Sequence, residues 1–281
     1  MQLIAIKNLF FDSLNLLYPK QEIISLFDRT VEYFLDYSKI EIHQKLHKNI
    51  DDIAEKKILD ALNRLKKAEP IQYVLGETYF YNCNLFTDKR ALIPRPETEY
   101  LVDQIVKEIP RDELLTMIDL GTGSGCIAIA LALFFIRSTF YAMDISPDAL
   151  ALAKANAVKN HVQIDFILDD ILDQKKTYPA FDIIVSNPPY VRNKEKKSMH
   201  RNVLDYEPSL ALIVEDDKPL KFYKAIADFA VKYLKPDGTI YLEINEYLST
   251  ETASLYQSMG FSHVEIIKDI NNKNRFIKVL R

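Results

Sequence analysis

The sequence has few cysteines and no long apolar segment. Its two cysteines, Cys83 and Cys126, are too few for a disulfide framework or a cysteine-rich zinc site, so we expect both to be reduced and structural, with no metal centre. A membrane-spanning helix needs about 18 consecutive apolar residues, and no such run is present. The first residues lack a basic segment followed by a continuous apolar core. We therefore expect neither a signal peptide nor a membrane anchor, and a cytoplasmic location.

Excess positive charge is also missing. The chain has 36 Lys and Arg against 40 Asp and Glu, for a net charge of -4. Because proteins that bind long nucleic acids usually carry a basic face, this balance counts against direct nucleic-acid binding. Internal repeats and low-complexity segments are absent too. What remains is a chain of 281 residues, 48% hydrophobic, long enough for one large domain or two ordinary ones.

Residues 1–70 have the apolar spacing of helices. A second helix is expected from about Gln21, with Ile24, Phe27 and Val31 facing inward. Ser38 and Asp51 stand at N-cap positions, and Pro70 ends the region. Acidic and basic residues are equal in number here. We expect a small helical domain over 1–70 for substrate recognition, while a packing extension with no partner of its own stays open. In the first predicted helix, the apolar residues that share one face are Leu3, Ile6, Phe10, Leu14 and Leu17.

The rest of the chain predicts a hairpin and then an α/β domain. Aromatic residues and turn formers in residues 71–90 are typical of a β-hairpin, here a linker. Across residues 91–281, strands alternate with helices from Leu114 onward, which indicates βαβ units and a parallel sheet. Two final strands, near 261–267 and 276–280, predict an antiparallel edge hairpin. The expected fold is α/β, a Rossmann-like sheet with an antiparallel edge hairpin, preceded by the small all-helical domain.

The segment Ser186-Asn187-Pro188-Pro189-Tyr190 follows an apolar run that reads as a buried strand. Open α/β sheets place their ligands at such carboxyl ends. Two prolines stiffen the loop and leave carbonyls free. The Asn187 side-chain oxygen and the Pro188 carbonyl can each accept one N–H of an –NH2 group, and Tyr190 can lie against its flat face. A strand end merely terminated by prolines is the alternative.

Another rigid segment precedes the sheet. Leu92-Ile93-Pro94-Arg95-Pro96-Glu97 holds its backbone extended through alternating prolines and then opens a helix. Arg95 and Glu97 could line a site, or the segment could be only a helix entry; spacing alone leaves both readings open.

A glycine-rich turn lies between the first predicted strand of the sheet and the next helix. Glycines 121, 123 and 125 let the backbone approach a ligand and aim N–H groups at it. Asp144 ends the next strand, where an acid can accept hydrogen bonds from both ribose hydroxyls. Asp170 ends the third strand and is placed to meet an adenine edge. These features fit an adenosine-bearing cofactor, although either acid could instead cap a helix.

This order of pieces resembles the class I methyltransferases, which use S-adenosyl-L-methionine and release S-adenosyl-L-homocysteine. Five segments extend the resemblance to the protein-(glutamine-N5) methyltransferases of class 1 peptide-chain release factors. They are Pro70–Gly76, Leu92–Glu99, Asp119–Gly125, Ser186–Tyr190 and Tyr206–Leu212. The resemblance covers roughly residues 70–281.

The resemblance implies an activity and a set of site residues. The methyl group would pass to the side-chain amide nitrogen of the glutamine in the release factor's Gly-Gly-Gln loop, and residues 91–281 would be the catalytic domain. Asn187, Pro188 and Tyr190 would be catalytic, with Pro189, Arg95 and Glu97 also binding the substrate. The cofactor residues would be Gly121, Thr122, Gly123, Ser124, Gly125, Asp144, Asp170, Ile171 and Asn187.

Some points stay open at this level. The family tends to have Glu-x-Gly-x-x-Gln after the fifth strand, whereas this chain has Glu243-Ile244-Asn245-Glu246-Tyr247-Leu248. Lys194 to Arg201 could form a solvated loop or a basic flap that contacts the partner. Alternative activities are glutamine methylation of a ribosomal protein and N-methylation of an adenine or guanine in nucleic acid. A catalytically idle adaptor with the same fold is a further alternative.

Overall fold

A computed structural model describes residues 1–281, apart from the side chain of Ser198. The chain divides into two compact units. The first comprises Met1–Gly76 with His200–Tyr206, and the second comprises Glu77–Met199 with Glu207–Arg281. None of the described helices is both long enough and apolar enough to cross a bilayer.

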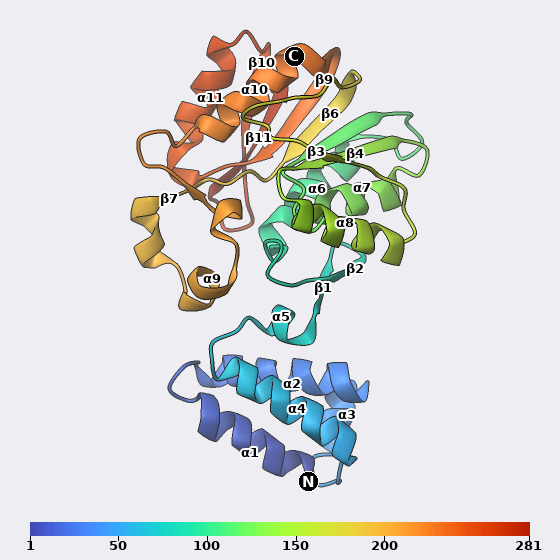
Figure 1. Cartoon of the computed structure of the whole chain (residues 1–281), viewed down its shortest axis with the longest axis vertical. Coiled ribbons are helices and arrows are strands. Elements are labelled where there is room, and N and C mark those ends of the chain that lie inside the picture. The colour runs from blue at the N-terminus through green and yellow to red at the C-terminus, as the bar shows by residue number, and fades with distance from the viewer. The chain divides into compact units, whose positions relative to one another are not determined.

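The first unit is helical (Figure 1). Its buried centre includes Phe10 and Phe27, whose rings meet edge to face with centroids 5.5 Å apart. Both predicted N-caps are confirmed: Ser38 accepts from Glu41 N, and Asp51 Oδ1 accepts from Ala54 N at 2.9 Å. The helices are α1 (Leu3–Leu14), α2 (Lys20–Leu35), α3 (Lys39–Gln44), α4 (Asp52–Leu65), α5 (Ile71–Leu75) and α9 (Arg201–Tyr206).

The buried face of α2 differs from the predicted one. Ile23 and Leu26 are buried with Phe27 and Val31, whereas Ile24 is only partly buried. The sequence obscures this stripe because it includes a polar residue, Thr30. Its hydroxyl donates to Leu26 O at 2.7 Å, so the side chain can be fully buried without an unpaired donor.

The predicted hairpin begins later than its sequence segment. Residues 71–75 form α5, which ends at Gly76 with a φ of 76°. Strands β1 (Glu77–Phe80) and β2 (Cys83–Phe86) then pair antiparallel. Tyr81 and Asn82 between them have φ values of 36° and 64°. Positive φ at both positions is what a two-residue hairpin turn requires.

The second unit is built on a seven-stranded sheet of order β10-β11-β9-β6-β3-β4-β5. Strand β11 is antiparallel to both its neighbours, and the other neighbouring pairs are parallel. The expected parallel sheet with an antiparallel edge hairpin is therefore confirmed. The strands are β3 (Thr116–Leu120), β4 (Thr139–Asp144), β5 (Asp165–Leu168), β6 (Phe181–Ser186), β9 (Leu234–Glu243), β10 (His263–Lys268) and β11 (Asn274–Leu280).

Helices cover both faces of this sheet (Figure 1). One face carries α6 (Pro96–Glu108), α7 (Cys126–Phe134) and α8 (Pro147–Lys159). The other carries α10 (Lys221–Tyr233) and α11 (Ser249–Ser258). Because α7 packs against α6, α8 and the sheet, its residues are apolar and those from Ile127 to Ala132 are buried. The short elements are β7 (Val191–Arg192), η1 (Asn193–Ser198), η2 (Ser209–Ala211), β8 (Ile213–Val214) and η3 (Glu246–Leu248).

Strand order decides where a ligand can bind. From β3 the chain runs to β4 and β5 on one side of the sheet, then returns to β6 on the other side. The helices leaving β3 and β6 therefore diverge, and a crevice opens at the carboxyl ends of these two strands. The glycine loop follows β3 and Asn187 follows β6. Both predicted motifs consequently reach the same edge.

Two buried polar residues support the glycine loop from below. Asn156 of α8 is fully buried; its Nδ2 donates to Ser124 O at 2.9 Å and to Phe86 O at 3.1 Å, and its Oδ1 accepts from Phe86 N at 2.7 Å. Asp119, near the end of β3, accepts from the Thr122 hydroxyl at 2.7 Å. The pKa of the Asp119 carboxyl is raised to about 7, chiefly by burial and to a smaller extent by the neighbouring Asp144, while the bond from Thr122 opposes the shift.

Replacing Asn156 by Ala should destabilise the second unit by about 3 kcal/mol, because the hydrogen bond to Ser124 O is buried and the two to the Phe86 backbone are partly buried. Asn160→Ala is the matched control on the same helix. Asn160 lies at a partly exposed position and donates to Asn84 O at 3.0 Å and to Asn156 O at 2.8 Å, so its loss should cost about 1 kcal/mol. Urea unfolding measures both. Equal losses for the two variants would contradict the role assigned to Asn156.

Asp119→Asn should change how stability depends on pH. The native Asp119 carboxyl, with a pKa of about 7 against an ordinary 3.8, holds a proton that the unfolded chain has already released. Wild-type stability must therefore fall as the pH rises through this window, and the variant lacks this loss. Relative to wild type, the variant should gain about 2–3 kcal/mol between pH 5 and pH 8. A difference in unfolding free energy that is constant over this range would contradict it.

Candidate functional site

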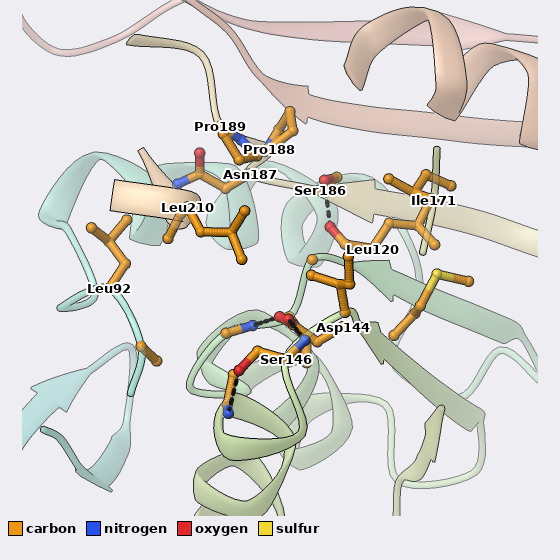
Figure 2. Close-up of a pocket in the computed structure, with 18 of the residues that line it drawn as sticks. Leu92, Leu120, Asp144, Ser146, Ile171, Ser186, Asn187, Pro188, Pro189 and Leu210 are labelled. Carbon is orange, nitrogen blue, oxygen red and sulfur yellow. Dashed lines mark hydrogen bonds between the residues drawn. The ribbon is translucent and has the colours of Figure 1, made fainter. Parts of the chain in front are cut away.

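A cavity of about 250 Å³ lies at the carboxyl edge of the sheet in the second unit. The loops that follow β3, β4, β5 and β6 all contribute to its lining. Figure 2 shows Asp144 and Ser146 on one side of the cavity and Asn187, Pro188 and Pro189 on the opposite side. Leu92 and Leu210 stand toward one end of the view and Ile171 toward the other. Mostly apolar walls with a few convergent polar groups are typical of small-molecule sites.

The glycines of the loop serve two different purposes. Gly121 and Gly123 line the cavity with φ values of 74° and 56°, and a Cβ on Gly121 would meet no atom within 4 Å. The space beside this backbone is thus open to a ligand. Gly125 does not line the cavity: a Cβ there would lie 3.1 Å from Ala153 Cβ and Ile129 Cδ1. Its role in the structure is close packing of α7 against α8.

Asp144 ends β4 at the cavity wall. Its Oδ2 accepts from Gly123 N at 2.8 Å and its Oδ1 accepts from Ser146 N at 2.9 Å. Burial raises the pKa of this carboxyl, and the backbone N–H groups partly oppose the shift. Each oxygen keeps a further lone pair for a ligand hydroxyl. Asp144 therefore both shapes the glycine loop and offers two acceptors to the cavity.

The loop after β5 contributes Asp169, Asp170 and Ile171. Asp170 Oδ1 accepts from Leu172 N at 2.8 Å, which folds a tight turn and leaves the second carboxylate oxygen available. Asp169 accepts from the Tyr178 hydroxyl and from Lys175 N at 3.1 Å, so it stabilises the loop itself.

Asn187 and Pro188 reach the cavity directly from β6. The strand end is fixed by Ser186, whose hydroxyl donates to Leu120 O at 2.5 Å and so ties β6 to β3. Asn187 Nδ2 donates to Thr98 Oγ1 at 3.0 Å. Since Pro188 and Pro189 have no N–H, the loop presents mainly acceptors to the cavity.

Tyr190 lies behind this loop and outside the cavity lining. Its hydroxyl donates to Glu243 Oε1 at 2.8 Å. Asn245, which together with Leu248 departs from the family pattern, donates to Tyr190 O at 3.0 Å and to Glu195 Oε2 at 3.0 Å. The departure therefore supplies hydrogen bonds that hold the loop after Pro189 in place.

Arg95 lines the cavity and forms an ion pair with Glu207, with 2.6 Å between Nη2 and Oε1. The Glu207 side chain is 1% exposed, and its Oε2 also accepts from Ile93 N at 3.0 Å. This bidentate acid fastens the proline-rich segment to the loop that carries Leu210. Glu97, in contrast, does not line the cavity.

The structure thus brings together most of the residues singled out from the sequence. Gly125, Tyr190 and Glu97 are the ones that it leaves outside the cavity lining. Those that do line it are Arg95, Gly121, Thr122, Gly123, Ser124, Asp144, Asp170, Ile171, Asn187, Pro188 and Pro189.

Sequence reasoning gave no role to Thr98, Glu207 or Glu243. Each is buried, and each bonds to a residue distant in the chain. An acidic residue at the end of an apolar strand, as in Ile240–Glu243, was the one signal that could have pointed to Glu243. Its partners could not be read from sequence, because they come from α6 and from the loop after β6.

The two thiols are not poised for chemistry. Both cysteines are free, and burial raises the pKa of each to about 12. A thiol of that kind is protonated at neutral pH and is a weak nucleophile.

Known proteins similar to this chain are methyltransferases. A family model described as the methyltransferase small domain matches residues 97–206. A release factor glutamine methyltransferase of Flavobacterium psychrophilum is 44% identical over 273 residues, covering 96% of each chain. One of Bacteroides thetaiotaomicron is 38% identical over 270 residues, again covering 96% of each chain.

Among solved structures, a methyltransferase from Pyrococcus furiosus matches with a TM-score of 0.53 at 16% identity. The match covers 82% of this chain and 98% of that one. That likeness concerns the fold and agrees with the expected class I methyltransferase sheet. The identity to the curated relatives extends over nearly the whole length of both chains, so the chain belongs to the release factor glutamine methyltransferase family.

Proposed function

We propose that this chain transfers a methyl group from S-adenosylmethionine to the side-chain nitrogen of a glutamine, the one in the Gly-Gly-Gln loop of a class 1 release factor. Family membership supports the reaction and the substrate class. One structural observation carries the chemistry. Asn187 and Pro188, two acceptors for an amide –NH2, face the glycine loop and Asp144 across a single cavity.

The residues of the cavity fit the cofactor. An open cradle beside Gly121 and Gly123 suits the amino acid part, because backbone can approach it without a side chain between. Asp144 offers acceptors for the ribose hydroxyls. Asp170 and Ile171 offer an acceptor and an apolar face for the adenine. We assign Thr122 and Ser124 to the same cradle, since both line the cavity.

The substrate loop addresses the main chemical difficulty, which is that an amide nitrogen is a poor nucleophile. When bound, the cofactor supplies an electrophilic methyl group on a sulfonium that leaves as a thioether. Two acceptors aligned on the N–H groups favour a pyramidal nitrogen and aim its lone pair along one direction. Such orientation can supply several kcal/mol of the barrier, and acceptors facing growing positive charge add an electrostatic contribution. The nitrogen becomes acidic once the new C–N bond forms, so its proton can leave to water without a strong base.

Residues 1–70 are proposed to recognise the release factor, with 71–90 as the linker to the catalytic domain. The matches to the two curated relatives cover 96% of this chain and so include most of residues 1–70, which supports a role shared with those relatives. The names of the curated relatives favour a protein glutamine over a nucleobase as the acceptor. We therefore place the enzyme in translation termination, with a release factor as its partner.

The direct test uses radiolabelled S-adenosylmethionine with an unmethylated class 1 release factor, wild type or with the Gly-Gly-Gln glutamine changed to Ala. Label on the first protein and none on the second establishes reaction, substrate and target together. Label on both would move the target to another residue. No label on either, with cofactor still bound, would favour the ribosomal-protein or nucleic-acid alternatives.

Asn187→Ala should lower kcat by about 100-fold or more, because one preorganised acceptor is lost. Cofactor affinity should change little. Steady-state kinetics and calorimetry separate the two effects, and Asn193→Ala, in the exposed segment that follows, is the matched control. A fall of only a few-fold in kcat would remove Asn187 from its role.

Asp144→Ala should act on binding first. Its carboxylate holds Gly123 and would also hold the ribose, so cofactor affinity should fall by about 10-fold or more, the worth of one or two charge-assisted hydrogen bonds. Asp148→Ala, an exposed acid in the first turn of α8, is the control. Calorimetric titration with S-adenosylhomocysteine measures both, and unchanged affinity in Asp144→Ala would exclude this residue from the site.

A further inference from the structure

The two ends of the Asn187 amide have opposite chemistry. The oxygen accepts hydrogen bonds and the nitrogen donates them. Only the oxygen can hold the –NH2 group of a glutamine, whereas the nitrogen would repel it and would suit a carboxylate. The reaction proposed above therefore depends on which end of this side chain faces the cavity.

Thr98 decides the orientation through its single proton. Thr98 Oγ1 lies 2.7 Å from Glu243 Oε2 and 3.0 Å from Asn187 Nδ2. The Thr98 hydroxyl donates its single proton to Glu243 Oε2. Thr98 Oγ1 can then only accept a hydrogen bond from Asn187. Only the nitrogen end of the amide can face it, since the oxygen end would set lone pair against lone pair.

Glu243 is held in place by hydrogen bonds to both of its carboxyl oxygens. It is 2% exposed at the end of β9, and its second oxygen accepts from the Tyr190 hydroxyl at 2.8 Å. Burial raises the pKa of this carboxyl and Glu97 adds to the rise, whereas the Thr98 and Tyr190 hydrogen bonds and the positive charge of Arg275 favour the ionised form. Both oxygens are thus occupied by donors from two different segments, which fixes the carboxylate in place.

Burying a carboxylate lowers stability even when the group has partners. Its two donors belong to the elements that frame the substrate loop: Thr98 to α6, and Tyr190 to the end of the loop itself. Apolar side chains in place of Thr98, Tyr190 and Glu243 would fill the same space without the desolvation cost of a buried carboxylate. The polar trio is best explained by the one thing that apolar packing could not do, which is to orient an amide.

We propose that Thr98 and Glu243 are positioning residues that lock the Asn187 amide with its oxygen toward the substrate nitrogen. The inference rests on the proposed function and deepens it. With Asn187 locked, the loop after β6 presents two acceptors to the substrate, the Asn187 oxygen and the Pro188 carbonyl. It thereby accepts the –NH2 of glutamine and rejects the carboxylate of glutamate.

The first test reads the side chain without any turnover. In a ¹⁵N–¹H spectrum of the full chain, the Asn187 Nδ2 signals are identified by their disappearance in Asn187→Ala. Thr98→Val keeps the shape of the side chain but removes the hydroxyl, so these signals should move toward those of solvent-exposed amides. Thr98→Ser restores the hydroxyl and should move them back. Signals that stay at their wild-type positions in Thr98→Val would overturn the proposal.

The second test is kinetic. Thr98→Val should lower kcat by about 10-fold or more, as expected when a preorganised dipole is misaligned, and should leave cofactor affinity unchanged. Thr98→Ser should recover most of the loss. Thr252→Val is the matched control, since Thr252 is fully buried on α11 and bonds only to Leu248 O at 2.7 Å. That variant tests whether losing a buried hydroxyl alone lowers turnover.

The outcomes separate this inference from the proposed function. Full kcat in Thr98→Val, or an equal loss in Thr252→Val, overturns the inference while release-factor methylation stands. Wild-type enzyme that leaves the release factor unlabelled refutes the proposed function, and the Asn187 signals then still decide whether Thr98 sets the amide. The positioning role is supported if the Asn187 Nδ2 signals move in Thr98→Val and if kcat falls in Thr98→Val but recovers in Thr98→Ser.

Discussion

Parallel pairing of β3 with its two neighbours is the interaction on which the site depends. Leu120 at the end of β3 pairs in register with Met143 of β4, and Asp119 pairs with Val185 of β6. Because the strands are parallel, their carboxyl ends stop at one edge and deliver the three loops together. The glycine loop, Asp144 and Asn187 are far apart in the chain, and no local interaction could assemble them.

The second constraint is the burial of polar groups beneath those loops. Asp119, Asn156 and Glu243 are each almost fully enclosed, yet each has hydrogen-bond partners that fix one segment of the site. Enclosed acids cost stability. They make geometric demands that apolar packing cannot make, because a hydrogen bond specifies both direction and donor. These hydrogen bonds therefore fix the backbone of the glycine loop and the side chain of Asn187, which line the cavity.

Sequence periodicity succeeded wherever local rules apply. Alternating strands and helices predicted the parallel sheet and its antiparallel edge hairpin, and capping chemistry located Ser38 and Asp51. It failed where a buried residue is polar. On α2 the buried face includes the polar residue Thr30, which apolar periodicity does not select; its hydroxyl donates to the backbone carbonyl of Leu26. Likewise, Gly125 matches its neighbours in sequence but faces the packed side of the loop.

The sequence by itself determined the order of elements, the glycine loop, the Asp144 position and the Asn187–Tyr190 loop, because each depends on residue type and short spacing. Only the tertiary structure decided that Tyr190 lies outside the cavity lining and that Thr98 joins Asn187 to Glu243 by hydrogen bonds. Those contacts join α6, β6 and β9 across long sequence separations. Which donor meets which acceptor there depends on how helix and sheet pack, and no pattern in the chain encodes that pairing locally.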